Sequence, residues 1–324
     1  MMNNVEKSAI VLDVGSRYLK CGMSGERSPR TVLRWEVAEL LQIQPPLTKA
    51  AWQEYVGEIL YDVCFKHLRV ASKNRRLVVC EDLLFPRNLR EALVEIVFNV
   101  LKAKQLVLLP AMTVALYATC HTTALIVDAG WHETRILPVF EQVPLLHAYT
   151  TTGLASRSSC DAIVQQVGAT DRTAEDILER ACFIAPDDMI DEAQDAHFFA
   201  MTPHALTIPA KTRSEVVETL FSGSEVDGSI PDAIEQCLSK CPVDTRRALR
   251  SNILCIGGTS MLPGFRDKLA KRLTDAKLVQ TYFPSHLMSW IGASIYGSTE
   301  AAQTHAISAD SFVDGSSVQD WMAV

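Results

Sequence analysis

The hydrophobic residues of this chain follow two alternating patterns. Short apolar runs that end at turn residues are typical of buried strands. Longer stretches carry apolar residues at helical spacing, as in Trp52 to Cys64, Leu89 to Leu101 and Phe265 to Leu273. Because strands and helices alternate along the chain, the sequence predicts an α/β fold. The predicted strands cover residues 9–13, 18–22, 76–80, 106–109, 124–128 and 253–256.

Local signals predict where three helices begin. Asn88 followed by Glu91 has the spacing of a capping pair, and so has Thr173 followed by Asp176. The Pro263-Gly264 pair predicts the start of the helix that carries Phe265.

A pair of glycines ends the predicted strand 253–256. Gly257 and Gly258 allow the backbone to turn sharply and to pass close to another group. A strand that ends in glycines and leads into a helix is a common nucleotide-binding arrangement in α/β folds. The same pattern also fits an ordinary connection between a strand and a helix.

A strand followed by Asp-x-Gly occurs twice, at Asp13 to Gly15 and at Asp128 to Gly130. Because this strand and motif are repeated, the sequence predicts two similar halves. The length of 324 residues allows two such lobes.

Composition excludes several classes of protein. Apolar residues make up 48% and charged residues 21%, as in ordinary globular proteins, and the net charge of −7 argues against a nucleic-acid surface. No apolar run approaches the ~20 residues of a membrane span. Residues 1–8 show no secretory signal, and the nine cysteines include no Cys-x-x-Cys. We therefore expect a cytoplasmic protein with reduced, partly buried thiols and no directly ligated metal.

Three segments resemble actins and actin-related proteins, in the order found in that family. They are Cys241 to Arg247, Gly257 to Gly264 and Ser289 to Ser294. The resemblance implies an actin-like ATPase fold, in which two duplicated ribonuclease-H-like lobes surround a nucleotide cleft. The first lobe would comprise 1–118 and 288–324, with a trimmed outer subdomain at about 31–74; the second would comprise 119–287, with a trimmed outer subdomain at about 156–224. The segment from Ile307 resembles the C-terminal helix and tail of actins.

The resemblance also implies a set of residues for nucleotide binding, with Asp13 and Asp128 holding a metal through water. Three residues depart from the family and crowd the phosphate end: Arg17, Trp131 and His132. The expected ligand is therefore either a structural, non-hydrolysed ATP with Mg²⁺ or none. The implied residues are Asp13, Gly15, Ser16, Arg17, Lys20, Asp128, Gly130, Glu179, Gly257, Gly258, Thr259 and Met261.

Two replacements predict that the chain is not an enzyme. Ala111 stands where actins have the catalytic glutamine, and Arg135 stands where they have the histidine that helps to position the attacking water. Neither side chain can orient a water molecule at neutral pH.

The amino-acid sequence of several segments resembles that of the divergent branch of actin-related proteins found at the pointed end of dynactin. This implies a structural subunit, located in the cytoplasm and cytoskeleton, whose partners are subunits of the actin-like filament and other pointed-end dynactin subunits. A retained face, including Met261 to Phe265 and the nearby Arg266 and Lys268, would bind the filament, and the trimmed 31–74 face would bind other partners. The alternatives are a nucleotide-hydrolysing ATPase and a nuclear actin-related subunit of a chromatin complex.

Overall fold

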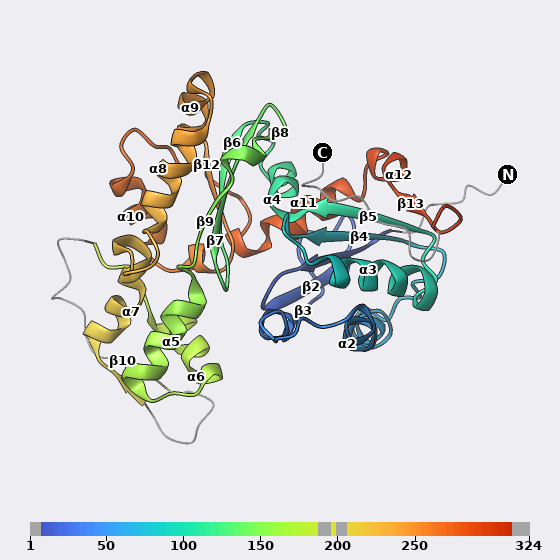
Figure 1. Ribbon diagram of the computed structural model, residues 1–324, viewed down its shortest axis with the longest axis horizontal. Coiled ribbons are helices and arrows are strands. Elements are labelled where there is room, and N and C mark those ends of the chain that lie inside the picture. The colour runs from blue at the N-terminus through green and yellow to red at the C-terminus, as the bar shows by residue number, and fades with distance from the viewer. Residues whose placement is uncertain (1–7, 187–195, 199–205, 313–324) are drawn as a thin grey trace. The chain divides into compact units, whose positions relative to one another are not determined.

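The protein combines two mixed sheets with helices, in agreement with the predicted α/β class (Figure 1). The computed structural model describes residues 8–186, 196–198 and 206–312. Contacts divide the chain into two units. The first comprises Met1–Cys120 and Leu287–Val324, and the second comprises His121–His286.

The sheet of the first unit has six strands among the described residues, in the order β13-β5-β4-β1-β2-β3. Its centre is parallel, and all residues of β1 and β4 are buried. Burial on both faces explains why these strands are continuous apolar runs. The strands are β1 (Ile10–Val14), β2 (Tyr18–Met23), β3 (Thr31–Arg34), β4 (Arg76–Glu81), β5 (Gln105–Pro110) and β13 (Ile307–Ser308).

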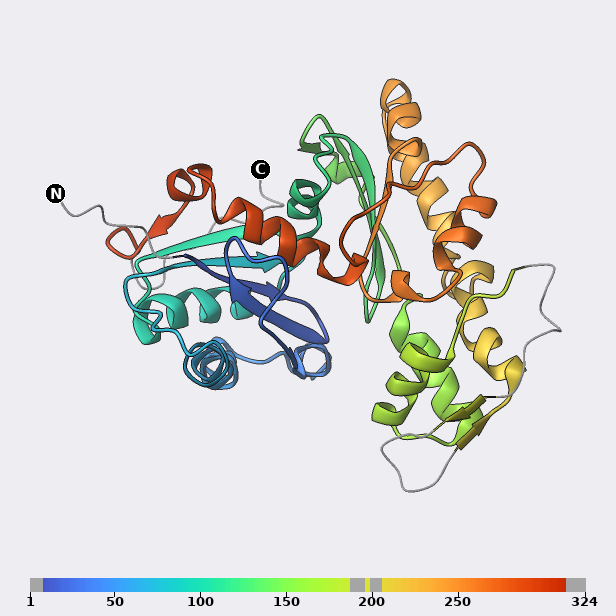
Figure 2. The same ribbon diagram turned by 180° about the vertical axis from the view of Figure 1, so that it is seen from behind.

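Helices cover both faces of this sheet. Helices α2 (Lys49–Asp62) and α3 (Arg87–Glu95) share a hydrophobic core with alternate strand residues such as Leu77 and Val79. Helix α11 (Met288–Tyr296) lies beside the sheet and contacts β1 and β4 (Figure 2). Its Trp290 indole donates to the carbonyl of Val11 at 3.3 Å. The remaining helical segments are α1 (Val37–Leu40), α4 (Ala111–Val114), α12 (Ala301–Thr304), the π-helical turns Val63–His67 and Ile96–Val100, and the 3₁₀ turn Ala115–Ala118.

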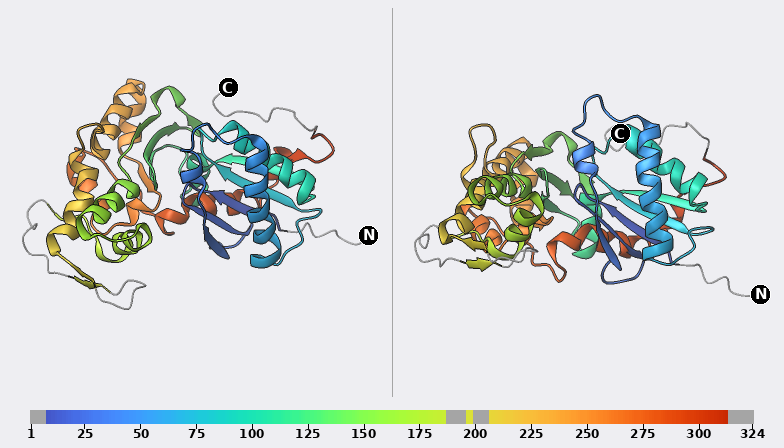
Figure 3. Two further views of the ribbon diagram at one scale, coloured as in Figure 1. Left: turned by 60° about the horizontal axis from the view of Figure 1, so that its bottom comes forward. Right: turned by 90° about the horizontal axis from the view of Figure 1, so that it is seen from below.

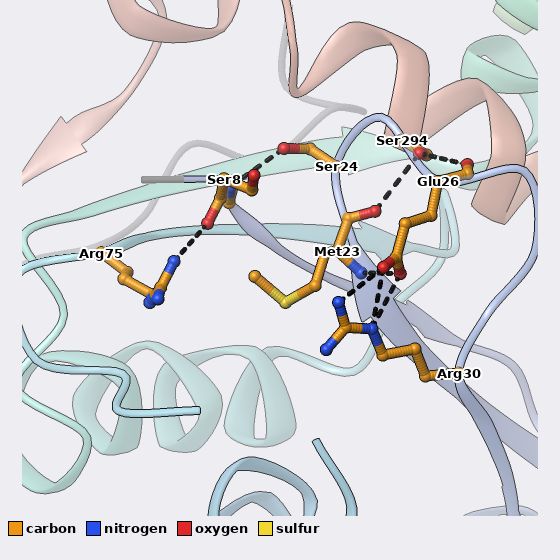
Figure 4. A network of polar contacts seen from close by, with 8 residues as sticks. Ser8, Met23, Ser24, Glu26, Arg30, Arg75 and Ser294 are labelled. Carbon is orange, nitrogen blue, oxygen red and sulfur yellow. Dashed lines mark hydrogen bonds and ion pairs between the residues drawn. The ribbon is translucent and has the colours of Figure 1, made fainter. Parts of the chain in front are cut away.

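A polar network joins α11 to the turn that follows β2 (Figure 4). The Ser294 hydroxyl donates to the carbonyl of Glu26 at 2.8 Å. The Glu26 carboxylate in turn accepts from the backbone N–H of Met23 at 3.0 Å and from Arg30 Nε at 2.8 Å. These bonds satisfy the polar groups of the turn and fix the end of the β1–β2 hairpin that lies away from its tip.

The main sheet of the second unit has the order β12-β6-β7-β8, with β9 also paired to β7. Strand β12 is parallel to β6, and the other pairs in this sheet are antiparallel. The strands are β6 (Ala124–Ala129), β7 (Thr134–Phe140), β8 (Val143–Pro144), β9 (Thr150–Thr152) and β12 (Ile253–Ile256); β10 (Ala196–Phe198) and β11 (Leu206–Ile208) pair separately.

Helices α8 and α9 of the second unit pack on its main sheet, and α5 packs on α6 and α7. None of the helices within the described ranges is long and apolar enough to cross a membrane. The helical segments are α5 (Ser156–Val167), α6 (Asp171–Ala181), α7 (Ala210–Ser222), α8 (Ile230–Lys240), α9 (Val243–Arg250), α10 (Phe265–Arg272) and the 3₁₀ turns Leu146–Ala148, Thr259–Met261 and Ser285–Leu287.

The two units repeat one arrangement of three strands. An antiparallel hairpin, β1–β2 or β6–β7, is joined by a parallel strand, β4 or β12. In both cases the parallel strand pairs with the hairpin strand that ends in Asp-x-Gly. The duplication predicted from the two Asp-x-Gly motifs is therefore visible in the topology.

Both predicted capping pairs are wrong. Pro86 occupies the position before α3, where its fixed φ suits a helix start, while Asn88 donates to the carbonyl of Leu47 and Glu91 pairs with Arg87. Helix α6 begins one turn before Thr173, because Thr170 accepts the backbone N–H of Thr173 and caps the helix first.

The predicted start of α10 is confirmed, and the predicted C-terminal helix is not. Gly264 has φ +84° and directly precedes α10, whose Phe265 and Leu269 are buried. Ile307 and Ser308 form β13 instead of a helix, because their backbone pairs with β5. The rest of the expected tail, residues 313–324, lies outside the described part of the chain.

We predict opposite effects of the same substitution at two helical glycines. A Cβ on Gly292 would overlap the carbonyl oxygen of Val114, whereas a Cβ on Gly57 would lie 3.9 Å from Ile96 Cδ1, an ordinary contact. Gly292→Ala should therefore destabilise the protein by about 1–3 kcal/mol through overpacking. Gly57→Ala should stabilise it by about 0.5–1 kcal/mol through helix propensity. Chemical denaturation of both variants would measure this, and an equally stable Gly292→Ala protein would contradict the packing described here.

Candidate functional site

The first candidate site lies at the tip of the β1–β2 hairpin. Asp13 is directly opposite Lys20 in the strand register, and their side chains form an ion pair with Nζ–Oδ2 at 2.7 Å. Gly15 turns the chain beyond Asp13, where a Cβ would lie only 2.9 Å from the carbonyl oxygen of Tyr18. The carbonyl of Gly15 accepts the indole N–H of Trp35 at 2.8 Å. The hairpin tip is thus held by contacts within the first unit.

Arg17 belongs to this hairpin, and its side chain is engaged by a residue that the sequence did not indicate. Only 4% of Arg17 is exposed, and its guanidinium donates to Glu39 Oε1 on α1 at 2.5 Å. Ser16, beside it in the tip, is half-buried. Glu39 was missed because nothing in the sequence connects a glutamate of the short α1 to a turn more than twenty residues earlier.

The second candidate site repeats this geometry at the β6–β7 hairpin. Asp128 is directly opposite Arg135, and Arg135 Nη2 lies 2.6 Å from Asp128 Oδ2. The tip is closed by a hydrogen bond from Gly130 N–H to the carbonyl of Glu133. Trp131 is buried, as expected of a side chain that fills space, and its carbonyl accepts from Arg157 N–H at 2.8 Å.

The glycine turn after β12 packs against this second hairpin. Gly257 has φ +86°, and a Cβ there would overlap the carbonyl oxygen of Ala129. Thr259, which is buried, donates to the carbonyl of Gly130 at 2.6 Å and shares a hydrogen bond with the Ser156 hydroxyl at 2.6 Å. Close backbone contact between the turn and the hairpin therefore requires glycine at position 257.

The second unit has desolvated surroundings at this hairpin. Burial raises the pKa of the Tyr149 phenol to about 12; the nearby Arg135 opposes this shift, and Glu133 and Asp128 add to it. The Tyr149 hydroxyl is buried and has no hydrogen-bond partner among the residues that the structure describes. Burial also raises the pKa of the Glu133 carboxyl. Charges placed here interact more strongly than they would in water.

The structure distributes the implied nucleotide residues over the two units. In the first unit it brings together Asp13, Gly15, Ser16, Arg17 and Lys20. In the second unit it brings together Asp128, Gly130, Gly257, Gly258 and Thr259. Glu179 is exposed on α6, and Met261 is 48% exposed after the glycine turn. Ser156, whose backbone N–H donates to the Thr259 hydroxyl, is a neighbour of the glycine turn that the sequence did not indicate.

The residues present fit a nucleotide only in part. At Gly258 a Cβ would meet no atom within 4 Å, so the backbone there is open to a ligand. At the two hairpin tips, the Asp13 carboxylate is already paired with Lys20 and the Asp128 carboxylate with Arg135. Among the described residues, no group of His, Cys, Asp and Glu could hold a metal ion directly. Ala111, at the start of α4, offers a methyl group where hydrolysis would need a polar side chain.

The cysteines of the chain are free. Eight are buried and Cys120 is exposed. Burial raises the pKa of the Cys160 and Cys182 thiols to about 12, so these groups stay protonated and unreactive at neutral pH. The expectation of partly buried, reduced thiols agrees with this arrangement.

Comparison with known proteins relates this arrangement to one family. The family model described as Actin matches residues 41–168 and 165–318. The chain is 25% identical to actin-related protein 10 of Dictyostelium discoideum, over 89% of this chain and 82% of that protein. It is 27% identical to human actin-like protein 9 and 26% identical to bovine actin-like protein 9, in each case over 91% of this chain and 83% of the relative. Since the family model covers most of the chain and the fold has two matching hairpin sheets, this protein belongs to the actin family.

Proposed function

We propose that this protein is a non-catalytic, structural actin-related subunit that caps the pointed end of the actin-like filament of dynactin. In this role it would support the binding of other pointed-end subunits, in the cytoplasm and on the cytoskeleton. The observation that carries the proposal is the ion pair between Asp128 and Arg135. It places a cation where a hydrolysing member of the family needs a group that can position water.

The same residues argue against the ATPase alternative. Hydrolysis requires an attacking water that is oriented by a hydrogen-bonding group, and general acid–base groups of this kind contribute about 10²–10⁴-fold to rate. Ala111 cannot accept or donate a hydrogen bond through its side chain. Arg135 is permanently protonated and so cannot accept a proton from water. A nucleotide held by this chain would therefore serve as a structural ligand.

The expected 31–74 face carries exposed aromatic residues. On α2 and the π-helical turn that follows, which Figure 3 shows side-on, Tyr61 is 50% exposed and Phe65 is 44% exposed. Their ring centroids are 4.5 Å apart, which makes a continuous aromatic surface. Aromatic side chains of this kind are enriched among the residues that dominate binding energy in interfaces. They support the assignment of non-actin partners to the 31–74 face.

One residue assigned to the retained face is structural. Lys268 is only 3% exposed, and its ammonium lies 2.6 Å from the Glu218 carboxylate. Reversing its charge would leave two carboxylates together in a buried position, which would unfold the region instead of testing an interface. Arg266 is half-buried and donates to the carbonyl of Val279. Two exposed residues nearby are suitable for a test, namely Met261 in the 3₁₀ turn and Asp267 on α10.

The first functional prediction is that the protein does not turn over ATP. Steady-state phosphate release should stay at the buffer background, with and without actin-like filaments, because neither Ala111 nor Arg135 can orient water. An actin preparation in the same assay provides the positive control. Filament-stimulated release at a rate comparable to that of the actin control would contradict a non-catalytic subunit.

The second functional prediction separates the two faces. Met261→Glu combined with Asp267→Lys should weaken binding to the filament by about tenfold or more, the scale of a truncated hot-spot residue. Tyr61→Ser combined with Phe65→Ser should leave filament binding intact and release the other pointed-end subunits.

Co-purification followed by mass spectrometry measures both effects, and thermal unfolding serves as the control for folding. If the Tyr61 and Phe65 changes release the filament while the Met261 and Asp267 changes do not, the two faces are assigned the wrong way round. Recovery of chromatin-complex subunits in place of dynactin subunits would favour the nuclear alternative.

A further inference from the structure

Both carboxylate oxygens of Asp128 are covered by the protein. Oδ2 accepts from the Arg135 guanidinium at 2.6 Å. Oδ1 lies against Gly257, only 2.6 Å from the point where a Cβ of that glycine would stand. The Asp128 side chain is accordingly 11% exposed. A hydrated cation that approaches this hairpin therefore meets a carboxylate that is already paired.

The charge of the Asp128 and Arg135 pair is also balanced. A divalent cation is attracted to a carboxylate that carries uncompensated negative charge, whether it binds directly or through its water shell. The pair of Asp128 and Arg135 is neutral in sum. Arginine stays protonated at all physiological pH values, so the balance does not change with pH. The buried surroundings, marked by the raised pKa values of Tyr149 and Glu133, strengthen the pair relative to one in water.

The positive charge opposite the hairpin aspartate departs from the family pattern at the second hairpin and not at the first. At the first hairpin, Lys20 belongs to a segment that resembles the actin pattern, so its pair with Asp13 agrees with the family. At the second hairpin the family resemblance assigns a histidine to position 135. A neutral imidazole would leave the charge of Asp128 uncompensated, whereas the guanidinium cancels it. The two hairpins have thereby become alike, each with a buried carboxylate directly opposite a cation.

We propose that Arg135 permanently replaces a divalent cation as the counter-charge of Asp128. The β6–β7 hairpin then takes no metal ion, and the stability of the protein does not depend on Mg²⁺, with or without bound ATP. The inference deepens the proposed function and rests on its non-catalytic part; it is independent of the filament contact. Metal dependence and filament binding are separate measurements, so the failure of one can be told from the failure of the other.

Thermal unfolding in EDTA and in excess MgCl₂ tests the inference. The wild-type midpoint should be the same in both buffers, and adding ATP should not make it depend on the metal. Arg135→His should lower the midpoint in EDTA, because Asp128 loses its partner, and Mg²⁺ should restore part of that loss. Arg135→Lys keeps the positive charge and should remain insensitive to Mg²⁺. A wild-type midpoint that rises with Mg²⁺, or an Arg135→His protein that does not respond to it, would overturn the proposal.

A second measurement uses the wild-type chain alone, so the test holds even if Arg135→His does not fold. The protein purified in buffer that contains Mg²⁺ is passed rapidly into metal-free buffer, and its metal content is determined by mass spectrometry. Well below one Mg²⁺ per chain is expected. One Mg²⁺ retained per chain would show that the hairpin region holds a metal despite Arg135 and would overturn the inference.

Discussion

Both sheets depend on an ion pair between a buried aspartate and the basic side chain directly opposite it in a β-hairpin. Asp13 and Asp128 each stand at the end of a fully buried strand, where an ionised group without a partner would be costly. Lys20 and Arg135 supply the partner from the directly opposite position of the next strand. Since the register is fixed by the apolar residues of the hairpins, the same packing that builds the sheets also brings the charges together.

The interactions that build the fold can be separated from those that the family uses for catalysis. The core strands, the glycine turn and helix α11 are held by packing, by backbone hydrogen bonds and by a few side-chain hydrogen bonds, such as those of Trp290 and Thr259. By the family resemblance, hydrolysis depends instead on the residues at positions 111 and 135. An actin architecture does not by itself determine which residues stand there. On the short α1, Glu39 likewise forms an ion pair with Arg17 of the same chain.

Much of this architecture could be predicted from the sequence, because it depends on apolar periodicity and on glycine. The strands at 9–13, 76–80, 124–128 and 253–256 are mainly apolar runs, and the duplicated Asp-x-Gly motif indicated two related sheets. Details that depend on competition between neighbours could not be predicted. Thr170 and Thr173 are both good capping residues, and only the packing of α6 decides between them.

The charges of the site were harder to predict than its backbone. Arg135 was identified as the loss of a histidine, but its pairing with Asp128 follows from strand register, which a motif does not state. Likewise, a lysine in a helix is ordinarily exposed, and no sequence pattern indicates that Lys268 is buried against Glu218. Long-range pairs of this kind depend on how the elements pack, so several partners of the candidate residues could not be predicted from the sequence.

The left-handed backbone of Gly257 has a consequence for how such motifs are interpreted. The space that a side chain would need at this position is filled by the protein itself, by the carbonyl of Ala129 and a carboxylate oxygen of Asp128. Substitution would therefore be selected against even in a lineage that never met a nucleotide. The glycine pattern of a binding loop can therefore persist after the ligand is lost, because the packing of the strand against the hairpin still requires glycine.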